Sequence, residues 1–291
     1  MRPSLFQEAK ALRYYNPMLW GIFFKNRLAV SGALCILGVF LVAIFAPFLA
    51  PYDPLAISVS SKLSPPSREH LLGTDHLGRD VFSRMLYGSR VSLLVGFIAV
   101  SISLVIGITV GSIAGYYGHT VDAVLMRFVD IMMCFPTFFL ILTVVALLGP
   151  NIFNVMVVIG LTSWMGTARF VRAEFLSVRE RDFIMAARAL GAGDLRIIFR
   201  HILPNAIAPI FVVATLNVAT AILVEAGLSF LGFGVQPPMP SWGNMLTAGR
   251  MYIFDAWWLT VFPGLAILVT VLSFNLFGEG LRDALDPRLR S

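Results

Sequence analysis

The chain has 291 residues, of which 58% are hydrophobic and 13% are charged, and its formal net charge is +6. Soluble globular proteins carry about 25% charged residues, so this composition excludes a protein whose whole surface faces water. A lipid bilayer accepts an apolar exterior, and the sequence therefore predicts an all-α integral membrane protein.

The N-terminal segment, residues 1–27, precedes the first long apolar run. Its last aromatic residues lie beside Lys25 and Arg27, a composition typical of an interfacial elbow helix. Residues 28–49 form the first predicted transmembrane helix, because a charge-free run of this length spans the hydrocarbon core. The run is too long and begins too late for a secretory signal peptide, so we expect it to be retained as an anchor.

The external segment 50–90 contains a short polar motif before the second apolar run. A turn at residues 73–75 leads into a predicted amphipathic helix, on which Asp80 and Arg84 are four residues apart. We interpret the motif as surface packing stabilised by this ion pair, in preference to a gate at the outer face. His76 has no second ligand near it in the sequence, so a metal site is not expected there.

The second predicted span, residues 91–117, has one face made of small residues. These residues recur at four-residue spacing and so share one side of the helix: Ser103, Gly107, Gly111 and Gly115. Small residues permit close packing of helices, either within the chain or against a second membrane protein. The sequence leaves both alternatives open.

The third apolar run, residues 131–168, is long enough for two helices. A turn sequence at residues 149–151 divides it into spans 131–148 and 152–168. Two further spans follow, at residues 202–224 and 256–278. The sequence thus predicts six transmembrane helices, with no clear charge well inside any of them.

Six spans place both termini on the same side of the membrane, and the positive-inside rule identifies that side as the cytoplasm. Sixteen of the 22 Lys and Arg residues then lie on the inner side. The expected core of five helices covers residues 91–279, with a cytoplasmic loop at 169–204 and an external loop at 225–255. Residues 280–291 form a cytoplasmic tail.

Several kinds of catalytic site have no basis in the sequence. The two cysteines lie in separate apolar runs, the four histidines lack HExxH spacing, and none of the lysines lies in a GxxxxGK[ST] nucleotide-binding motif. We therefore expect no metal, no cofactor and no enzymatic activity in this chain. Membrane topology accounts for the positive charge, so nucleic acid is not an expected partner.

The cytoplasmic loop has the pattern helix, glycine turn, helix. Residues 181–190 have helical composition, Gly191 and Gly193 interrupt it, and the helix resumes at residues 195–203 before Pro204. Small residues at the turn allow a partner protein to approach the backbone closely. The alternative is a basic amphipathic hairpin that lies on anionic lipid.

This loop resembles the EAA loop of ABC importer permeases, in which EAA is followed by three residues, G, nine residues, I, one residue and LP. The chain has Ala186-Ala187, Gly191 and Leu203-Pro204 at those positions, with Met185 in place of the glutamate and His201 in place of the isoleucine. Residues 71–93, 228–246 and 274–290 are similar to further blocks of the same group, in the same order. The chain therefore resembles the dipeptide, oligopeptide and nickel importer family of ABC transporter permeases, and within it the C-type subunits of dipeptide importers.

The resemblance implies the type I importer fold and a coupling role for the loop. It would dock on a separate ATPase subunit, and the contact residues are Met185, Ala186, Ala187, Arg188, Gly191, Leu203 and Pro204. The implied partners are a homologous permease in a heterodimer, two ATPase subunits that hold ATP and Mg, an external substrate-binding protein, and membrane lipid. The implied location is the cytoplasmic (inner) membrane of a bacterium or archaeon.

Polar residues in the later spans are candidates for the wall of the translocation pathway: Asn217, Thr220, Glu225 and Asn275. Each of the uncharged residues is equally explained as a hydrogen-bonding contact between helices, and Glu225 as a carboxylate at the membrane edge that caps a loop. In the external loop, the resemblance assigns the contact with the binding protein to Pro237, Pro238 and Trp242. The alternative for Trp242 is a place in the aromatic belt.

The expected function is that of a permease subunit, forming half of a pathway for di- and oligopeptides. Related importers carry nickel, glutathione or another small solute, so these cargoes are alternatives. A secondary transporter driven by an ion gradient is less favoured, because such carriers use ionisable or broken-helix sites inside their spans.

Overall fold

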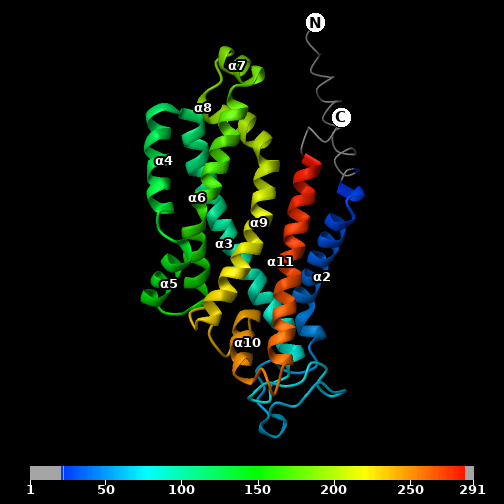
Figure 1. The fold of residues 1–291 in the computed structure, drawn as a ribbon. Coiled ribbons are helices and arrows are strands. Elements are labelled where there is room, and N and C mark those ends of the chain that lie inside the picture. Colours follow the sequence, from blue (N-terminus) through cyan, green and yellow to red (C-terminus); the bar gives the residue numbers. More distant parts are fainter. Residues whose placement is uncertain (1–20, 22, 286–291) are drawn as a thin grey trace.

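Long helices run between the two ends of the molecule (Figure 1). The computed structural model describes residue 21 and residues 23–285. The main helices are α2 (Arg27–Leu49), α3 (Val81–Tyr117), α4 (His119–Met133), α5 (Thr137–Leu148), α6 (Ile152–Arg179), α7 (Asp182–Ala189), α8 (Asp194–Arg196), α9 (Leu203–Phe230), α10 (Trp242–Gly249) and α11 (Trp258–Leu285). All named elements in this part of the chain are helical, which confirms the predicted all-α class.

Five continuous helices are long and apolar enough to cross a membrane: α2, α3, α6, the helix Asp194–Phe230 that includes α8 and α9, and α11. A sixth crossing is provided if α4 and α5 together form one span, bent by 77° between Met133 and Thr137. Large apolar side chains such as Leu34, Ile44 and Phe48 are exposed on α2. A bilayer would cover these side chains, so the structure fits a multi-pass membrane protein.

The prediction of a single helix over residues 131–148 is wrong. Helix α4 begins at His119, directly after Gly118, whose φ is +67°. The charged residues of α4 lie before residue 131, where the predicted apolar run begins. Two of them, Asp122 and Asp130, form ion pairs with α6. The helix ends before Pro136, which has no backbone N–H to continue it.

Several other helix ends differ from the predicted spans. Helix α3 begins ten residues before the predicted second span. The side chain of Asp80 accepts a hydrogen bond from the backbone N–H of Ser83 and caps the helix at this point. Helix α9 extends to Phe230 and α11 to Leu285, into segments expected to be loop and tail. The elbow helix and the C-terminal tail lie mostly outside the described residues.

The small face of α3 packs against α6 within the chain. A Cβ atom added to Gly107, Gly111 or Gly115 would lie 2.7, 2.5 or 2.6 Å from an atom of α6. Since real Cβ atoms do not approach so closely, glycine is needed at each position for the two helices to meet. The contact resolves the two alternatives for this stripe in favour of packing within the chain.

The Gly111→Ala substitution is expected to lower the free energy of unfolding by about 1–3 kcal/mol, because the added methyl group forces α3 away from α6. Thermal unfolding of the detergent-solubilised protein, followed by tryptophan fluorescence, measures this change. Gly166→Ala on α6 is the matched control: a Cβ there meets nothing within 4 Å, and alanine favours the helix by about 1 kcal/mol. Equal destabilisation by both variants would contradict the packing argument.

Candidate functional site

The loop between α6 and α9 forms a distinct projection at one end of the molecule, carrying α7 and α8 (Figure 1). Ile184 on α7 is fully buried. It belongs to an apolar group, here called the α7 cluster, that joins α7 to α3, α6 and α9: Tyr116, Val171, Phe175, Val178, Ile184, Ile197, Ile198, Ile202, Ala206 and Ile210. The buried contact fixes α7 to the ends of the long helices, so a force on α7 acts on them directly.

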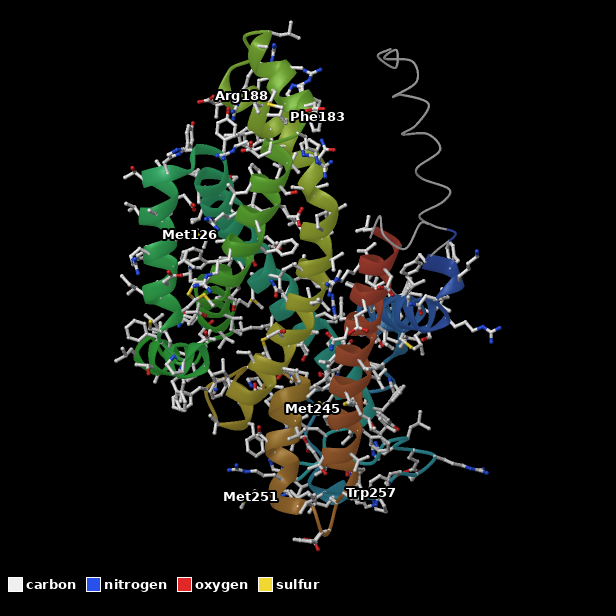
Figure 2. All side chains as sticks on the ribbon, turned by 45° about the horizontal axis from the view of Figure 1, so that its top comes forward. Met126, Phe183, Arg188, Met245, Met251 and Trp257 are labelled. Atoms are coloured by element: carbon white, nitrogen blue, oxygen red, sulfur yellow. The ribbon has the colours of Figure 1, made fainter. Side chains whose placement is uncertain are left out.

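Large apolar side chains are exposed on α7 to either side of Ile184, and on the turn that follows the helix. Phe183, Met185 and Leu190 are 40%, 52% and 88% exposed, and Leu195 and Phe199 beyond the turn are 70% and 64% exposed. We call these five residues the coupling surface. Figure 2 shows Phe183 and Arg188 together at this end of the molecule. Exposed apolar surface of this kind marks a contact with another protein or with a membrane.

The turn after α7 is a Schellman motif centred on Gly191. The N–H of Ala192 donates to the carbonyl of Ala187 (3.0 Å), and the N–H of Gly191 donates to that of Arg188 (2.9 Å). Gly191 has φ +81°, a conformation that favours glycine, and no atom lies within 4 Å of the position a Cβ would take. The chain therefore turns sharply here and leaves its backbone open to a partner.

The predicted coupling residues divide into two groups. Met185, Ala186, Arg188 and Gly191 are exposed on α7 and its turn, as a docking surface requires, and Ala187 between them is half-buried. Leu203 instead packs against the α7 cluster, and Pro204 lies exposed in the first turn of α9, where the missing N–H costs no helical hydrogen bond. Leu203 and Pro204 therefore lie outside the coupling surface, in the first turn of α9.

Polar contacts hold the loop against the end of α3. The guanidinium of Arg188 lies 5.2 Å from the centre of the Tyr116 ring, and the Tyr116 hydroxyl donates to Asp194 (2.7 Å). Arg179 at the end of α6 donates to the carbonyl of Tyr116 (2.9 Å). Arg188, predicted to contact a partner, thus also fastens α7 to this chain.

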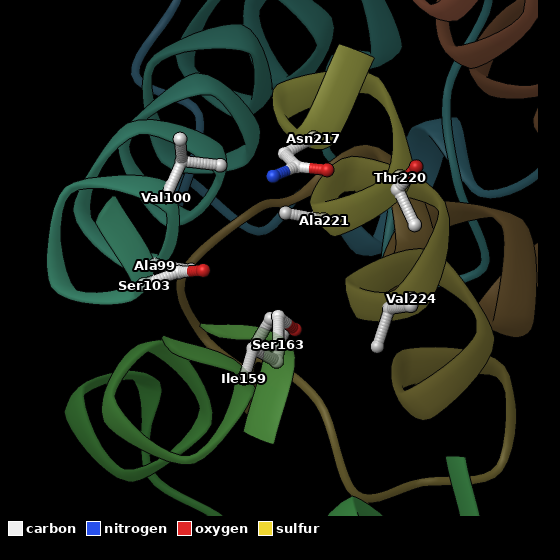
Figure 3. A pocket seen from close by; sticks show the side chains of 9 residues that line it. All are labelled: Ala99, Val100, Ser103, Ile159, Ser163, Asn217, Thr220, Ala221 and Val224. Atoms are coloured by element: carbon white, nitrogen blue, oxygen red, sulfur yellow. The ribbon is translucent and has the colours of Figure 1, made fainter. Parts of the chain in front are cut away.

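A small cavity of about 30 Å³ lies between α3, α6 and α9 (Figure 3). Asn217 and Thr220, two of the predicted pathway residues, line it together with Ser103 and Ser163. Asn217 also donates to the hydroxyl of Thr167 on α6 (3.2 Å), so it serves as a contact between helices as well. Ser163 was not predicted, because a single serine in an apolar helix carries no sequence signal of its surroundings.

The other two residues predicted to line the pathway, Glu225 and Asn275, are not part of this cavity. Glu225 is fully buried inside α9, where its carboxylate accepts hydrogen bonds from Ser229 (2.6 Å) and Ser241 (3.1 Å). It is not among the residues that line the cavity, and its hydrogen bonds attach it to the loop after α9. Asn275 is half-buried on α11 and does not line the cavity.

The loop between α9 and α11, which was predicted to be external, folds back so that α10 packs beside both helices (Figure 1). Trp242 is only 3% exposed; its backbone N–H donates to Ser92 and its indole N–H donates to the carbonyl of Met85, both at 3.2 Å. Neither of its predicted roles, binding-protein contact or aromatic belt, agrees with this burial. Pro237 and Pro238 are exposed and keep the predicted position for such a contact.

The segment between α2 and α3, which was predicted to be external, contains a group of buried charges that continues into the start of α3. Asp75 accepts a hydrogen bond from the Nε of Arg79 (2.7 Å) and lies 3.6 Å from the Nε of Arg84, and all three residues are more than 90% buried. The predicted pair of Asp80 with Arg84 is wrong, because Asp80 caps α3 and contacts His70 instead (2.9 Å). Burial lowers the pKa of the neighbouring His76, whose ring stacks on Tyr252.

Comparison with known proteins matches two family profiles. Residues 107–291 match the binding-protein-dependent transport system inner membrane component, and residues 18–66 match the N-terminal TM domain of oligopeptide transport permease C. The first match covers α4 to α11, which include the coupling surface and most of the cavity lining. The second covers α2 and the start of the external segment.

Individual relatives are similar over nearly their whole length. The dipeptide transport system permease protein DppC of Alkalihalophilus pseudofirmus is 49% identical over 92% of this chain and 88% of its own. The di/tripeptide transport system permease protein DppC of Pseudomonas aeruginosa is 45% identical over 97% of this chain and 95% of its own.

Among solved structures, inward-facing conformations of the MetNI methionine ABC transporter have a similar fold. One chain superposes with a TM-score of 0.53 at 20% sequence identity, covering 70% of this chain and 98% of that one. This likeness concerns the fold alone, and it agrees with the expected type I importer architecture.

Proposed function

Because the chain belongs to the family of binding-protein-dependent transport system inner membrane components, we propose that it is a permease subunit of an ABC importer for di- and oligopeptides. The proposed cargo rests on the 49% identity to a protein named as a dipeptide permease, over most of both chains. The chain would form half of the pathway, together with a homologous permease.

The coupling surface is the proposed contact with one of two ATPase subunits, which would bind ATP and Mg and perform the hydrolysis. Met185 and Leu190 present apolar side chains, and Gly191 presents open backbone, so a partner cleft of matching shape gains contact area without burying an unpaired charge. Ile184 and the α7 cluster would pass the motion of the ATPase to α6 and α9.

In the proposed orientation, α7 faces the cytoplasm and both termini lie on that side of a bacterial or archaeal inner membrane. The external substrate-binding protein would then approach the opposite end, where Pro237 and Pro238 are exposed. Basic residues in the loop that carries α7 support this orientation, because cytoplasmic loops are enriched in them.

Uptake by the assembled importer in proteoliposomes tests this function. With binding protein outside and ATP at the ATPase subunits, we expect accumulation of a radiolabelled dipeptide, and none when the ATPase subunits are left out. Accumulation driven by an ion gradient alone would contradict the proposal. Transport of nickel or glutathione in place of peptides would keep the permease role and overturn the cargo.

A further inference from the structure

The cavity between α3, α6 and α9 contains a buried hydroxyl group that makes no hydrogen bond. Ser103 is 1% exposed, and its Oγ atom has no hydrogen-bond partner among the residues that the structure describes. In Figure 3 this hydroxyl points into the space between the three helices. A buried hydroxyl without a partner is unfavourable, because it has given up its bonds to water and received none in exchange. The position therefore indicates a ligand in the cavity.

Two other hydroxyls on α3 bond to the backbone of their own helix. Ser101 donates to the carbonyl of Phe97, and Thr109 donates to the carbonyl of Val105, both at 2.7 Å. Each bond joins a residue to the one four positions earlier, a pattern common for serine and threonine in helices. Ser103 does not bond in this way, so its hydroxyl is available to a ligand in the cavity.

Three further polar side chains line the same cavity, from α6 and α9: Ser163, Asn217 and Thr220. Asn217 uses its amide nitrogen to donate to Thr167, which leaves its amide oxygen to accept from another group. The hydroxyl of Thr220 donates to a carbonyl of its own helix (3.2 Å) and can still accept. Together with Ser103, the lining therefore offers hydrogen-bonding groups from three helices.

The size and polarity of the cavity indicate which ligand fits. The volume open to the centre of a water-sized molecule is about 30 Å³, and one water molecule needs about 10–15 Å³ of such volume. The walls are otherwise apolar: Ala99, Val100, Ile159, Ala221 and Val224. Within the described part of the chain, no Asp, Glu, Lys or Arg lines the cavity to balance the charge of a bound ion. The ligand that fits is therefore small and uncharged, and both donates and accepts.

We propose that one or two water molecules bind in this cavity, between the hydroxyl of Ser103 and the amide of Asn217. Water both donates and accepts, so one molecule satisfies the two side chains at once. Ser163 and Thr220 are exposed at the rim of the cavity and supply further partners, of which a bound water typically uses about three. The water thereby links α3 to α6 and α9 through hydrogen bonds. This site is independent of the proposed peptide cargo, because only the residues around the cavity form it.

Radiolytic footprinting of the full chain in detergent tests the site. A pulse of X-rays converts water to hydroxyl radicals, and water bound beside a buried side chain oxidises that side chain although bulk solvent does not reach it. Ile159 lines the cavity and is 1% exposed, so mass spectrometry should detect its oxidation. In the Ser103→Val variant an apolar side chain replaces the buried partner of the water, and the oxidation of Ile159 is expected to fall severalfold.

The matched control is Ser101→Val, because Ser101 lies on the same helix, is exposed and does not line the cavity. The oxidation of Ile159 should be the same in this variant as in the unmodified protein. An equal fall in both variants, or unchanged oxidation in Ser103→Val, would overturn the inference. So would a change in the oxidation of Ile159 when choline replaces sodium in the buffer, since it would identify a cation as the ligand.

A density map of the unmodified protein, at a resolution that shows ordered water, provides a second measurement without any substitution. We expect a peak at hydrogen-bonding distance from the Oγ atom of Ser103. If the map shows no such peak and the Ser103 hydroxyl is turned to the carbonyl of Ala99 in its own helix, the cavity does not bind water.

Discussion

Replacing Gly191 with tryptophan is expected to abolish ATP-driven uptake while the protein remains in the membrane. The residue has φ +81° and lies at the open end of the turn beside Leu190. An indole there would project from the coupling surface and hold an ATPase subunit away from α7. Immunoblotting of membranes measures the amount of protein, and uptake by the reconstituted importer measures coupling.

Gly191→Asn is the control for this prediction. Asparagine tolerates a positive φ better than other side chains and is much smaller than tryptophan, so most of the uptake should be retained. If the tryptophan variant transports normally, the turn after α7 is not the site at which an ATPase docks. If both variants fail equally, the conformation of the turn matters and its surface does not.

Replacing Asp75 with alanine is expected to cost about 3–5 kcal/mol of the free energy of unfolding, since it leaves the buried cations Arg79 and Arg84 without their carboxylate. The carboxylate also accepts hydrogen bonds from the backbone N–H groups of Leu77 and Arg79, which are lost at the same time. Thermal unfolding of the solubilised protein should show a markedly lower midpoint.

Glu69→Ala provides the comparison, because Glu69 is an exposed acid in the same segment between α2 and α3. Removing an exposed charge typically changes stability by less than about 0.5 kcal/mol. A similar shift for both variants would mean that Asp75 does not neutralise the buried arginines.

The apolar spans could be predicted because length and hydrophobicity are local properties of the sequence. Helix α4 could not, since Asp122, Arg127 and Asp130 make its sequence look like a loop. Two of these charges are neutralised by arginines of α6 about 40 to 50 residues later in the chain. The length of an apolar run carries no information on pairing between such distant residues.

In the candidate site, too, local features could be predicted from the sequence and contacts between distant residues could not. The turn at Gly191 was predictable, because glycine after a short helix is a local signal for a left-handed turn. The positions of Glu225 and Trp242 were not, because Ser241 and Ser92 reach them from other elements. Asp80 and Arg84 have the spacing of a helical ion pair, but Asp80 is the N-cap residue of α3 and Arg84 pairs with Asp75.

The helix from Asp194 to Phe230 is continuous across its π-helical segment Ile197–Ile202 and joins the α7 loop to the opposite end of the molecule. Its 37 residues span about 55 Å, so tilting the whole helix by about 5° about Asp194 displaces its other end by roughly 5 Å. That far end carries Glu225, whose hydrogen bond to Ser241 attaches the segment before α10. The helix therefore connects the loop that carries α7 with the segment before α10, at opposite ends of the molecule.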